Sequence, residues 1–260
     1  MDFRLIRYAA GQRVARITLN RPDKRNALDD TMVGELTSAF LAAARDANVK
    51  IVVLAAAGPA FCAGADLVQL ERMSAFDLEQ NRADSLRLAT LYRTMYEIRK
   101  PVIGLVHGPA LAGGCGLASV CDFVLAARDR ATFGYTEVRI GFVPAIVSVY
   151  LAKRIGEGRA REMILRGNVL RATEAEAIGL ITAAVPDDQL EKLGTELVQE
   201  LIAQNSGTAM GMAKEMLGMM NGMNMADAVD FAVNVNASAR MTADCKKGVQ
   251  AFLQKQQPEW

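Results

Sequence analysis

The sequence predicts an α/β fold that is followed by a helical C-terminal region. Apolar runs of strand length occupy residues 51–56, 102–107 and 123–126, and segments with apolar residues at helical spacing separate them. From residue 146 onward the pattern is helical, except for a short apolar stretch at 180–185. Because strand, loop and helix recur in that order, we expect helices to pack against a sheet.

Alternation and capping signals predict the N-terminal elements. Residues 3–19 alternate polar and apolar side chains around Gly11, which predicts a β-hairpin, and we assign its closing turn to residues 20–22. Apolar residues then recur at helical spacing to about residue 44. Three residues are candidates for the N-cap of this helix: Asp29, Asp30 and Thr31.

The C-terminal part carries further helix-start signals and no low-complexity linker. Thr173-x-x-Glu176 is a candidate capping box. Further helices are predicted to begin near four residues: Asp187, Ser206, Asn224 and Thr242. We therefore divide the chain into a core domain, residues 1–195, and a C-terminal helical region, residues 196–260.

Composition excludes several classes of function. Thirty basic and twenty-nine acidic side chains give a formal charge of +1, so no overall field attracts nucleic acid or an anionic membrane. No window approaches the roughly 18 apolar residues of a membrane span, and the N-terminus has no signal-peptide pattern, so we expect a cytoplasmic protein. The four cysteines show no CxxC spacing, so no metal site is predicted.

Two glycine-containing loops, each directly after a predicted buried strand, are candidates for ligand contact. They are FCAGADL (61–67) and GPALAGGCGLA (108–118), and neither the G-x-G-x-x-G nor the G-K-[ST] phosphate pattern occurs in them. Small residues let a ligand approach the backbone, which makes the amides of Ala65 and Gly113 usable donors. Two amides directed at one oxygen can stabilise the oxyanion that forms when a thioester becomes an enolate. The alternative is that the small residues serve packing alone.

Five segments together resemble one enzyme family over nearly the whole chain. They are ITLNRPDKRNAL (17–28), FCAGADL (61–67), PVIGLVHGPALAGGCGLASVCD (101–122), FGYTEVRIGFVPA (133–145) and GVQAFLQK (248–255). Their order and separation are similar to those of the enoyl-CoA hydratase/isomerase (crotonase) family. The resemblance implies a crotonase (ClpP-like) spiral of β-β-α turns, with a C-terminal helical trimerisation region and a homotrimer or a dimer of trimers.

The resemblance also implies roles for individual residues. Ala65 and Gly113 match the oxyanion-hole donors of the family. The positions that hold coenzyme A match eight residues: Arg25, Ala27, Leu28, Ala63, Asp66, Leu67, Phe252 and Lys255. The last two match positions that reach the coenzyme of a neighbouring subunit. The implied substrate is an acyl-CoA thioester of fatty acid metabolism, with coenzyme A entering as part of the substrate and no permanently bound cofactor.

The family's paired glutamates distinguish the possible reactions. Glu137 matches the second glutamate, whereas Gly116 stands where the first would be. One carboxylate suffices for a Δ3-Δ2-enoyl-CoA isomerase, because a single base can move a proton between two carbons. Feruloyl-CoA hydratase/lyases hydrate with the second glutamate alone. We therefore predict an enoyl-CoA hydratase, with the isomerase and a non-catalytic acyl-CoA-binding protein as alternatives.

The surroundings of Glu137 and one cysteine lead to three further expectations. Apolar neighbours of Glu137 should raise its pKa by desolvation. The segment Ala145-Ile146-Val147 is bulkier than the glycines that often follow this proline in the family, so it should narrow the pocket. His107 and Cys115 could form a nucleophilic pair, but a packed thiol and a hydrogen-bonded histidine are the preferred interpretation.

Overall fold

The computed structural model describes residues 2–260 and contains a six-stranded sheet with the order β1-β2-β3-β4-β6-β9. Only the first pair, β1 with β2, is antiparallel, and every later pair is parallel. The strands are β1 (Ile6–Gly11), β2 (Val14–Leu19), β3 (Ile51–Ala56), β4 (Val102–Val106), β6 (Phe123–Ala127) and β9 (Ala183–Val185). The α/β prediction is therefore confirmed.

Both faces of the central strands are covered, which explains their unbroken apolar sequence. A Cβ at Gly104 would lie 3.2 Å from the sulfur of Cys121, directly after α4, whereas the adjacent Leu105 packs against Gly194 of α7. Because successive side chains of a strand point to opposite faces, α4 and α7 lie on opposite sides of β4. Such strands read as continuous apolar runs rather than as alternation.

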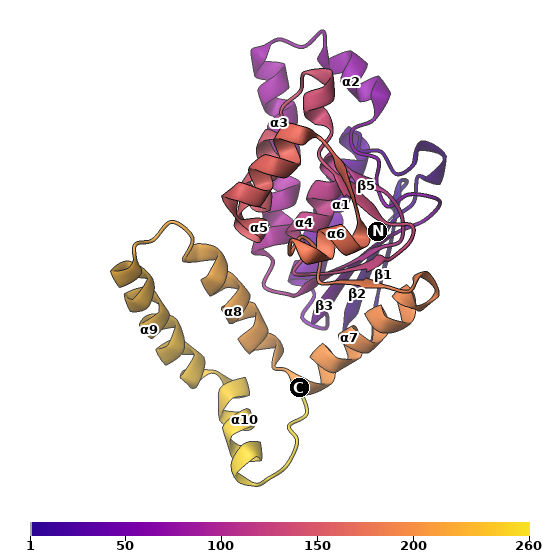
Figure 1. Cartoon of the computed structure of the whole chain (residues 1–260). Coiled ribbons are helices and arrows are strands. Elements are labelled where there is room, and N and C mark those ends of the chain that lie inside the picture. The colour runs from indigo at the N-terminus through magenta and orange to yellow at the C-terminus, as the bar shows by residue number, and fades with distance from the viewer. Residues whose placement is uncertain (1) are drawn as a thin grey trace.

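The helices of the body alternate with the strands (Figure 1). Asp29 is the N-cap of the first long helix, because its carboxylate accepts a hydrogen bond from the Met32 amide at 2.8 Å. The helical elements are η1 (Pro22–Lys24), α1 (Asp30–Arg45), α2 (Leu67–Met73), α3 (Leu78–Glu97), α4 (Gly113–Val120), η2 (Glu137–Ile140), α5 (Ala145–Arg166), α6 (Ala172–Ala177), η3 (Asp187–Gln189) and α7 (Leu190–Gln204). Within residues 2–260, none of them is long and apolar enough to cross a membrane.

A second, three-stranded sheet lies beside the two glycine-containing loops and was not predicted. It has the order β5 (Ala110–Leu111), β7 (Thr132–Gly134) and β8 (Val169–Arg171). Strands of two or three residues are too short to show alternation. This sheet carries the loop after Gly108 and the segment before Glu137 on neighbouring strands, because β5 pairs with β7.

Two local predictions were wrong. The hairpin closes at Gln12 and Arg13, whose φ values of 48° and 65° form a two-residue turn, whereas residues 20–22 follow the second strand. The capping box of α6 is shifted by two residues: the Glu174 carboxylate accepts from the Arg171 amide at 2.7 Å, so Thr173 is not the cap. Both errors arose because capping and turn residues occur in clusters, and tertiary contacts select among them.

The last three helices form an arm that extends away from the body (Figure 1). They are α8 (Gly207–Met219), α9 (Met225–Met241) and α10 (Ala243–Leu253), and their N-caps are the predicted Ser206, Asn224 and Thr242. The chain then returns to the base of the arm, where the Trp260 indole donates to the Gln204 carbonyl at 3.0 Å. The division expected after residue 195 lies within α7, which packs on the sheet.

Candidate functional site

The two glycine-containing loops lie against each other. A Cβ at Gly114 would lie 2.2 Å from the Cys62 carbonyl oxygen, and a Cβ at Gly64 would lie 2.8 Å from the Cβ atom of Ala112. Gly64 also has a φ of 94°, which side chains disfavour. The Leu111 amide donates to the Cys62 carbonyl at 2.9 Å, which joins the loops by backbone. Glycine is therefore required here for close approach, and the packing explanation is correct for Gly64 and Gly114.

This contact brings the two predicted amide donors to one place. Ala65 directly follows Gly64, and the nitrogen of Gly113 would lie 3.7 Å from a Cβ at Gly64. Gly113 is the first residue of α4, where an amide has no acceptor within its own helix. Within residues 2–260, neither the Ala65 amide nor the Gly113 amide donates a hydrogen bond. Both donors are thus available to a ligand.

A cavity of about 420 Å³ opens beside these amides. Most of its lining is apolar, and it combines residues from α1, α2, α3, η2 and α5 with the two loops. The predicted site residues that line it are Leu28, Ala63, Ala65, Leu67, Gly113 and Glu137. The segment from Pro144 to Val147 also forms part of the wall, which is where the sequence placed these bulkier side chains; that they narrow the pocket stays a prediction.

Among the described residues 2–260, Glu137 is the one carboxylate lining this cavity that forms no ion pair. It begins the short helix η2, and burial raises its pKa above the usual glutamate value of 4.5. Within the described residues 2–260, its Oε2 atom is buried without a hydrogen-bond partner. A buried, unpaired carboxylate costs free energy unless a ligand or water uses it, so this position is a candidate for proton transfer.

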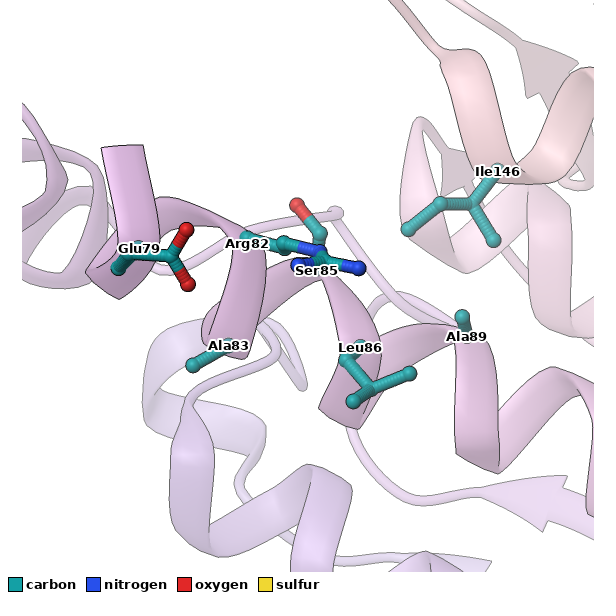
Figure 2. Close-up of a pocket in the computed structure, with 7 residues that line it drawn as sticks. All are labelled: Glu79, Arg82, Ala83, Ser85, Leu86, Ala89 and Ile146. Atoms are coloured by element: carbon teal, nitrogen blue, oxygen red, sulfur yellow. The ribbon is translucent and has the colours of Figure 1, made fainter. Parts of the chain in front are cut away.

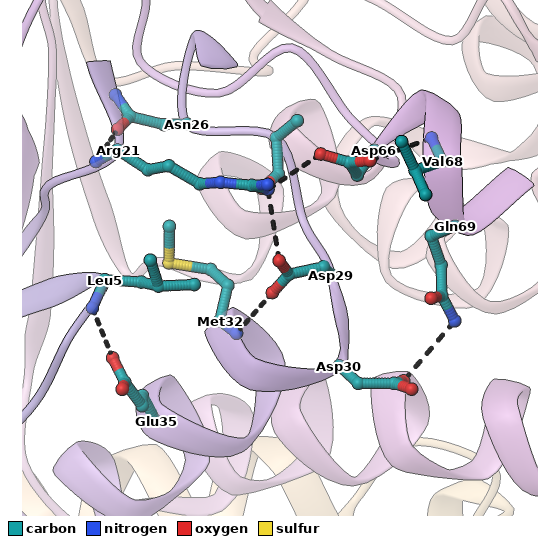
Figure 3. Close-up of polar contacts among 11 residues, drawn as sticks. Leu5, Arg21, Asn26, Asp29, Asp30, Met32, Glu35, Asp66, Val68 and Gln69 are labelled. Carbon is teal, nitrogen blue, oxygen red and sulfur yellow. Dashed lines mark hydrogen bonds and ion pairs between the residues drawn. The ribbon is translucent and has the colours of Figure 1, made fainter. Parts of the chain in front are cut away.

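An ion-pair network fixes the loop before α2 (Figure 3). Arg21 Nη1 lies 2.8 Å from the Asp66 carboxylate and 3.2 Å from that of Asp29. Asp66 also accepts from the Val68 amide at 2.8 Å and so caps α2. Burial alone would raise the pKa of Asp66, but the Val68 amide and the Arg21 charge outweigh burial and lower it. The Asp66 carboxylate is therefore engaged by partners within the protein.

The remaining predicted coenzyme-binding residues lie outside the cavity. Arg25 is exposed and has a left-handed backbone, and its carbonyl accepts from the Ala63 amide at 3.0 Å. Ala27 is buried beside Leu28. Phe252 is 81% exposed at the end of α10, and Lys255 follows it on the same arm, so one chain does not bring them to the cavity (Figure 1).

Comparison with known proteins identifies the family. Residues 9–260 match the family described as enoyl-CoA hydratase/isomerase. The chain belongs to this family.

Relatives and solved structures agree with that assignment. The chain is 40% identical over 247 residues to a Thermus thermophilus protein provisionally named an enoyl-CoA hydratase, covering 95% of this chain and 97% of that protein. It is 31% identical to the 2,3-dehydroadipyl-CoA hydratase of Escherichia coli, covering 96% and 95%. An enoyl-CoA hydratase structure from Mycobacterium smegmatis superposes with a TM-score of 0.92 at 33% identity over 99% of each chain. The crotonase spiral is thereby confirmed.

At Gly116, where the family's first glutamate would stand, neighbouring side chains leave no room for a larger residue. A Cβ at Gly116 would lie 2.4 Å from Val147 Cγ1 and 2.8 Å from the hydroxyl oxygen of Tyr92. The Tyr92 hydroxyl donates to the Gly113 carbonyl at 2.8 Å. The place of a first glutamate is thus filled by two other side chains. Sequence reasoning missed Tyr92, because it lies in an ordinary apolar repeat of α3.

The thiol-nucleophile hypothesis does not fit the structure. Burial raises the pKa of Cys115 to about 12, so its thiol is neutral at physiological pH. His107 Nε2 is 2.7 Å from the Gly58 carbonyl oxygen, and it therefore acts as a hydrogen-bonded structural residue. The Ser119 and Tyr135 hydroxyl groups share a buried hydrogen bond of 2.7 Å, and Ser119 also contacts the Cys115 carbonyl oxygen. These residues support the loop and do not line the cavity.

Proposed function

We propose that this chain is an enoyl-CoA hydratase that adds water reversibly to a 2-enoyl-CoA and uses Glu137 as its only carboxylate. The thioester oxygen is held by the amides of Ala65 and Gly113, and coenzyme A enters as part of the substrate. Leu28, Ala63 and Leu67 contact the pantetheine and acyl portions. The observation that carries the proposal is the buried, partnerless Oε2 atom of Glu137 in the same cavity as two unpaired amides.

The reaction needs one proton to leave a water molecule and one to reach the α-carbon. Ionised Glu137 takes a proton from water while the hydroxide oxygen bonds to the β-carbon and the double-bond electrons move to the thioester oxygen. The two amides stabilise the enolate, each worth about 2.7–4 kcal/mol in comparable sites. Protonated Glu137 then returns its proton to the α-carbon. Its raised pKa suits both steps, because the group must accept and donate near neutral pH.

Two alternatives differ in what they require of Glu137. A Δ3-Δ2-enoyl-CoA isomerase would use the same carboxylate and amides without water, which a single-carboxylate site also favours. A non-catalytic acyl-CoA-binding protein gains nothing from a buried carboxylate that costs stability. The names of the relatives favour the hydratase.

The test is to supply crotonyl-CoA and 3-hexenoyl-CoA in separate assays and to separate the products by chromatography. We expect 3-hydroxybutyryl-CoA from the first, and loss of at least a hundredfold in kcat for Glu137→Gln, because general acid–base catalysis contributes about 10²–10⁴-fold. Glu157→Gln is the matched control, since Glu157 is an exposed glutamate of α5. Double-bond migration without hydration would establish the isomerase, and full activity of Glu137→Gln would remove the base.

We also propose that the chain assembles as a homotrimer or a dimer of trimers in the cytoplasm. Large apolar side chains of the arm are exposed in one chain, among them Met225 at 80% and Phe252 at 81%, and an assembly would bury them. This arrangement would allow Phe252 and Lys255 to reach the coenzyme of a neighbouring subunit. The four cysteines are all free thiols, as is usual in a reducing compartment. Light scattering of the purified protein tests the mass of the assembly.

A further inference from the structure

The water that adds to the double bond needs more than one hydrogen-bond partner in the protein. Bound water in proteins makes about three hydrogen bonds. Among residues 2–260, Glu137 Oε2 is a buried atom without a partner, and it can accept one bond from this water. Gly116 offers no side chain for a second bond, and Tyr92, which fills the space beside it, does not line the cavity. A second partner must therefore come from another part of the wall.

Most polar side chains of the cavity wall are already engaged by the protein. Its three aspartates form ion pairs with arginines, and the Gln69 amide donates to one of these carboxylates at 3.0 Å. Two hydroxyl groups remain, those of Ser85 and Thr136, and neither makes a hydrogen bond within residues 2–260. Ser85 lies on α3 with Ile146 across from it, where it also borders a neighbouring pocket (Figure 2). Thr136, in contrast, directly precedes Glu137.

The Thr136 hydroxyl has no structural partner, although its position usually provides one. Thr136 is the N-cap of η2, where a threonine side chain usually accepts from a helix amide, yet its side chain makes no such bond. Its carbonyl accepts from the Arg139 amide at 3.0 Å, so the backbone that carries the hydroxyl is fixed. In the described part of the chain, residues 2–260, the only buried side-chain polar atoms without a partner are Glu137 Oε2 and Asn168 Oδ1, so Thr136 Oγ1 is open to water.

We infer that Thr136 binds the attacking water together with Glu137. One hydrogen of this water is donated to Glu137 Oε2 and the other to Thr136 Oγ1, so a lone pair of the water oxygen is left to face the β-carbon. As the new C–O bond forms, the O–H bond that faces Glu137 breaks and its proton passes to the carboxylate, while the double-bond electrons move to the thioester oxygen. Thr136 keeps its own proton throughout. The inference rests on the proposed function, since this is the water of that reaction.

A role in holding water differs from a role in holding the acyl-CoA or Glu137. Removal of an α-proton from a saturated acyl-CoA uses the same carboxylate and the same two amides, but it consumes no water. Loss of the Thr136 hydroxyl should therefore slow hydration far more than it slows exchange of that α-proton with solvent. Because the thioester does not depend on Thr136, the loss should appear in kcat rather than in KM.

Thr136→Val tests the inference, because valine has a similar shape and the hydroxyl that it lacks makes no bond within residues 2–260. We expect kcat for crotonyl-CoA hydration to fall by at least about tenfold, since a misplaced reactant can cost about a hundredfold. Thr136→Ser keeps the hydroxyl and should restore most of the rate. Thr132→Val is the matched control, because Thr132 lies earlier in the same segment, on β7, and does not line the cavity.

Exchange of the α-protons of butyryl-CoA in deuterium oxide, followed by NMR, gives the second readout, and Glu137→Gln sets its background. Thr136→Val should retain a larger fraction of the wild-type exchange rate than of the wild-type hydration rate. Equal losses of the two rates would show that Thr136 acts on Glu137 or on the fold, and they would overturn the inference. Full hydration activity in Thr136→Val would overturn it as well.

Failure of the inference is distinguishable from failure of the proposed function. If the wild type and Thr136→Val hydrate crotonyl-CoA equally fast, the hydratase stands and the water has another partner. If the wild type exchanges α-protons or moves the double bond of 3-hexenoyl-CoA but hydrates nothing, the hydratase proposal falls and the inference falls with it.

Discussion

Gly116 is a position where one added methyl group should destabilise the protein, although alanine favours helices. A Cβ there would lie 2.4 Å from Val147 Cγ1 and 2.8 Å from the Tyr92 hydroxyl oxygen, and both side chains are buried. Overpacking of this kind costs about 1–3 kcal/mol, whereas replacing a helical glycine gains at most about 1 kcal/mol. We therefore expect Gly116→Ala to lower the free energy of unfolding by up to about 2 kcal/mol, because the cost of overpacking exceeds the gain in helix propensity.

Gly34→Ala provides the control for this substitution. Gly34 also lies inside a helix, α1, but a Cβ there would meet nothing within 4 Å. That variant should gain about 0.5–1 kcal/mol. Urea titrations at one protein concentration compare the two with the wild type. If Gly116→Ala is as stable as Gly34→Ala, the proposed wall of Tyr92 and Val147 is not where the structure places it.

A double variant separates this contact from other effects of Gly116→Ala. Val147→Ala removes the Cγ1 atom that the new methyl group would meet. The cost of Gly116→Ala should therefore be smaller in a Val147→Ala background, by about 1 kcal/mol, since contacting residues are not additive. Strictly additive losses would contradict the steric explanation. Gly116→Glu places a still larger side chain there, so restoring the family's first glutamate should not raise the rate of crotonyl-CoA hydration above that of the wild type.

Two further predictions concern groups that surround the proposed reaction. Burial raises the pKa of Glu137, so the folded state loses stability as pH rises from the usual glutamate pKa of 4.5 through the raised pKa. Glu137→Gln should therefore be more stable than the wild type at pH 8 but not below pH 4.5. Urea titrations at several pH values measure this, and a difference that stays constant with pH would contradict it. Tyr92→Phe removes the 2.8 Å hydrogen bond from the Tyr92 hydroxyl to the Gly113 carbonyl, which should cost about 1–3 kcal/mol of stability. It should also lower kcat more than it raises KM. An unchanged kcat in steady-state kinetics would show that Tyr92 does not position the Gly113 peptide.

The sequence predicted the main elements because their signals are local. The strands β3, β4 and β6 are continuous apolar runs, and α8, α9 and α10 begin at ordinary capping residues. The strands β5, β7 and β8 were missed because two or three residues carry no periodic signal. Their pairing depends on residues far apart in the chain, which no local pattern encodes.

The site was predictable only in part, for a related reason. Glycine spacing and motif order identified Ala65, Gly113 and Glu137, which the fold brings to one cavity. The wall formed by Tyr92 and Val147 could not be predicted, because contact between α3, α4 and α5 is a property of packing rather than of any one segment. The role of Asp66 as a partner of Arg21 was hidden for the same reason.

The most direct measurement is a crystal structure of the Glu137→Gln variant with crotonyl-CoA bound. The proposed reaction predicts that the thioester oxygen lies about 2.7–3.1 Å from both the Ala65 and Gly113 nitrogens, with the residue 137 side chain facing the double bond. A thioester oxygen bound elsewhere, or residue 137 turned away from the acyl carbons, would contradict it.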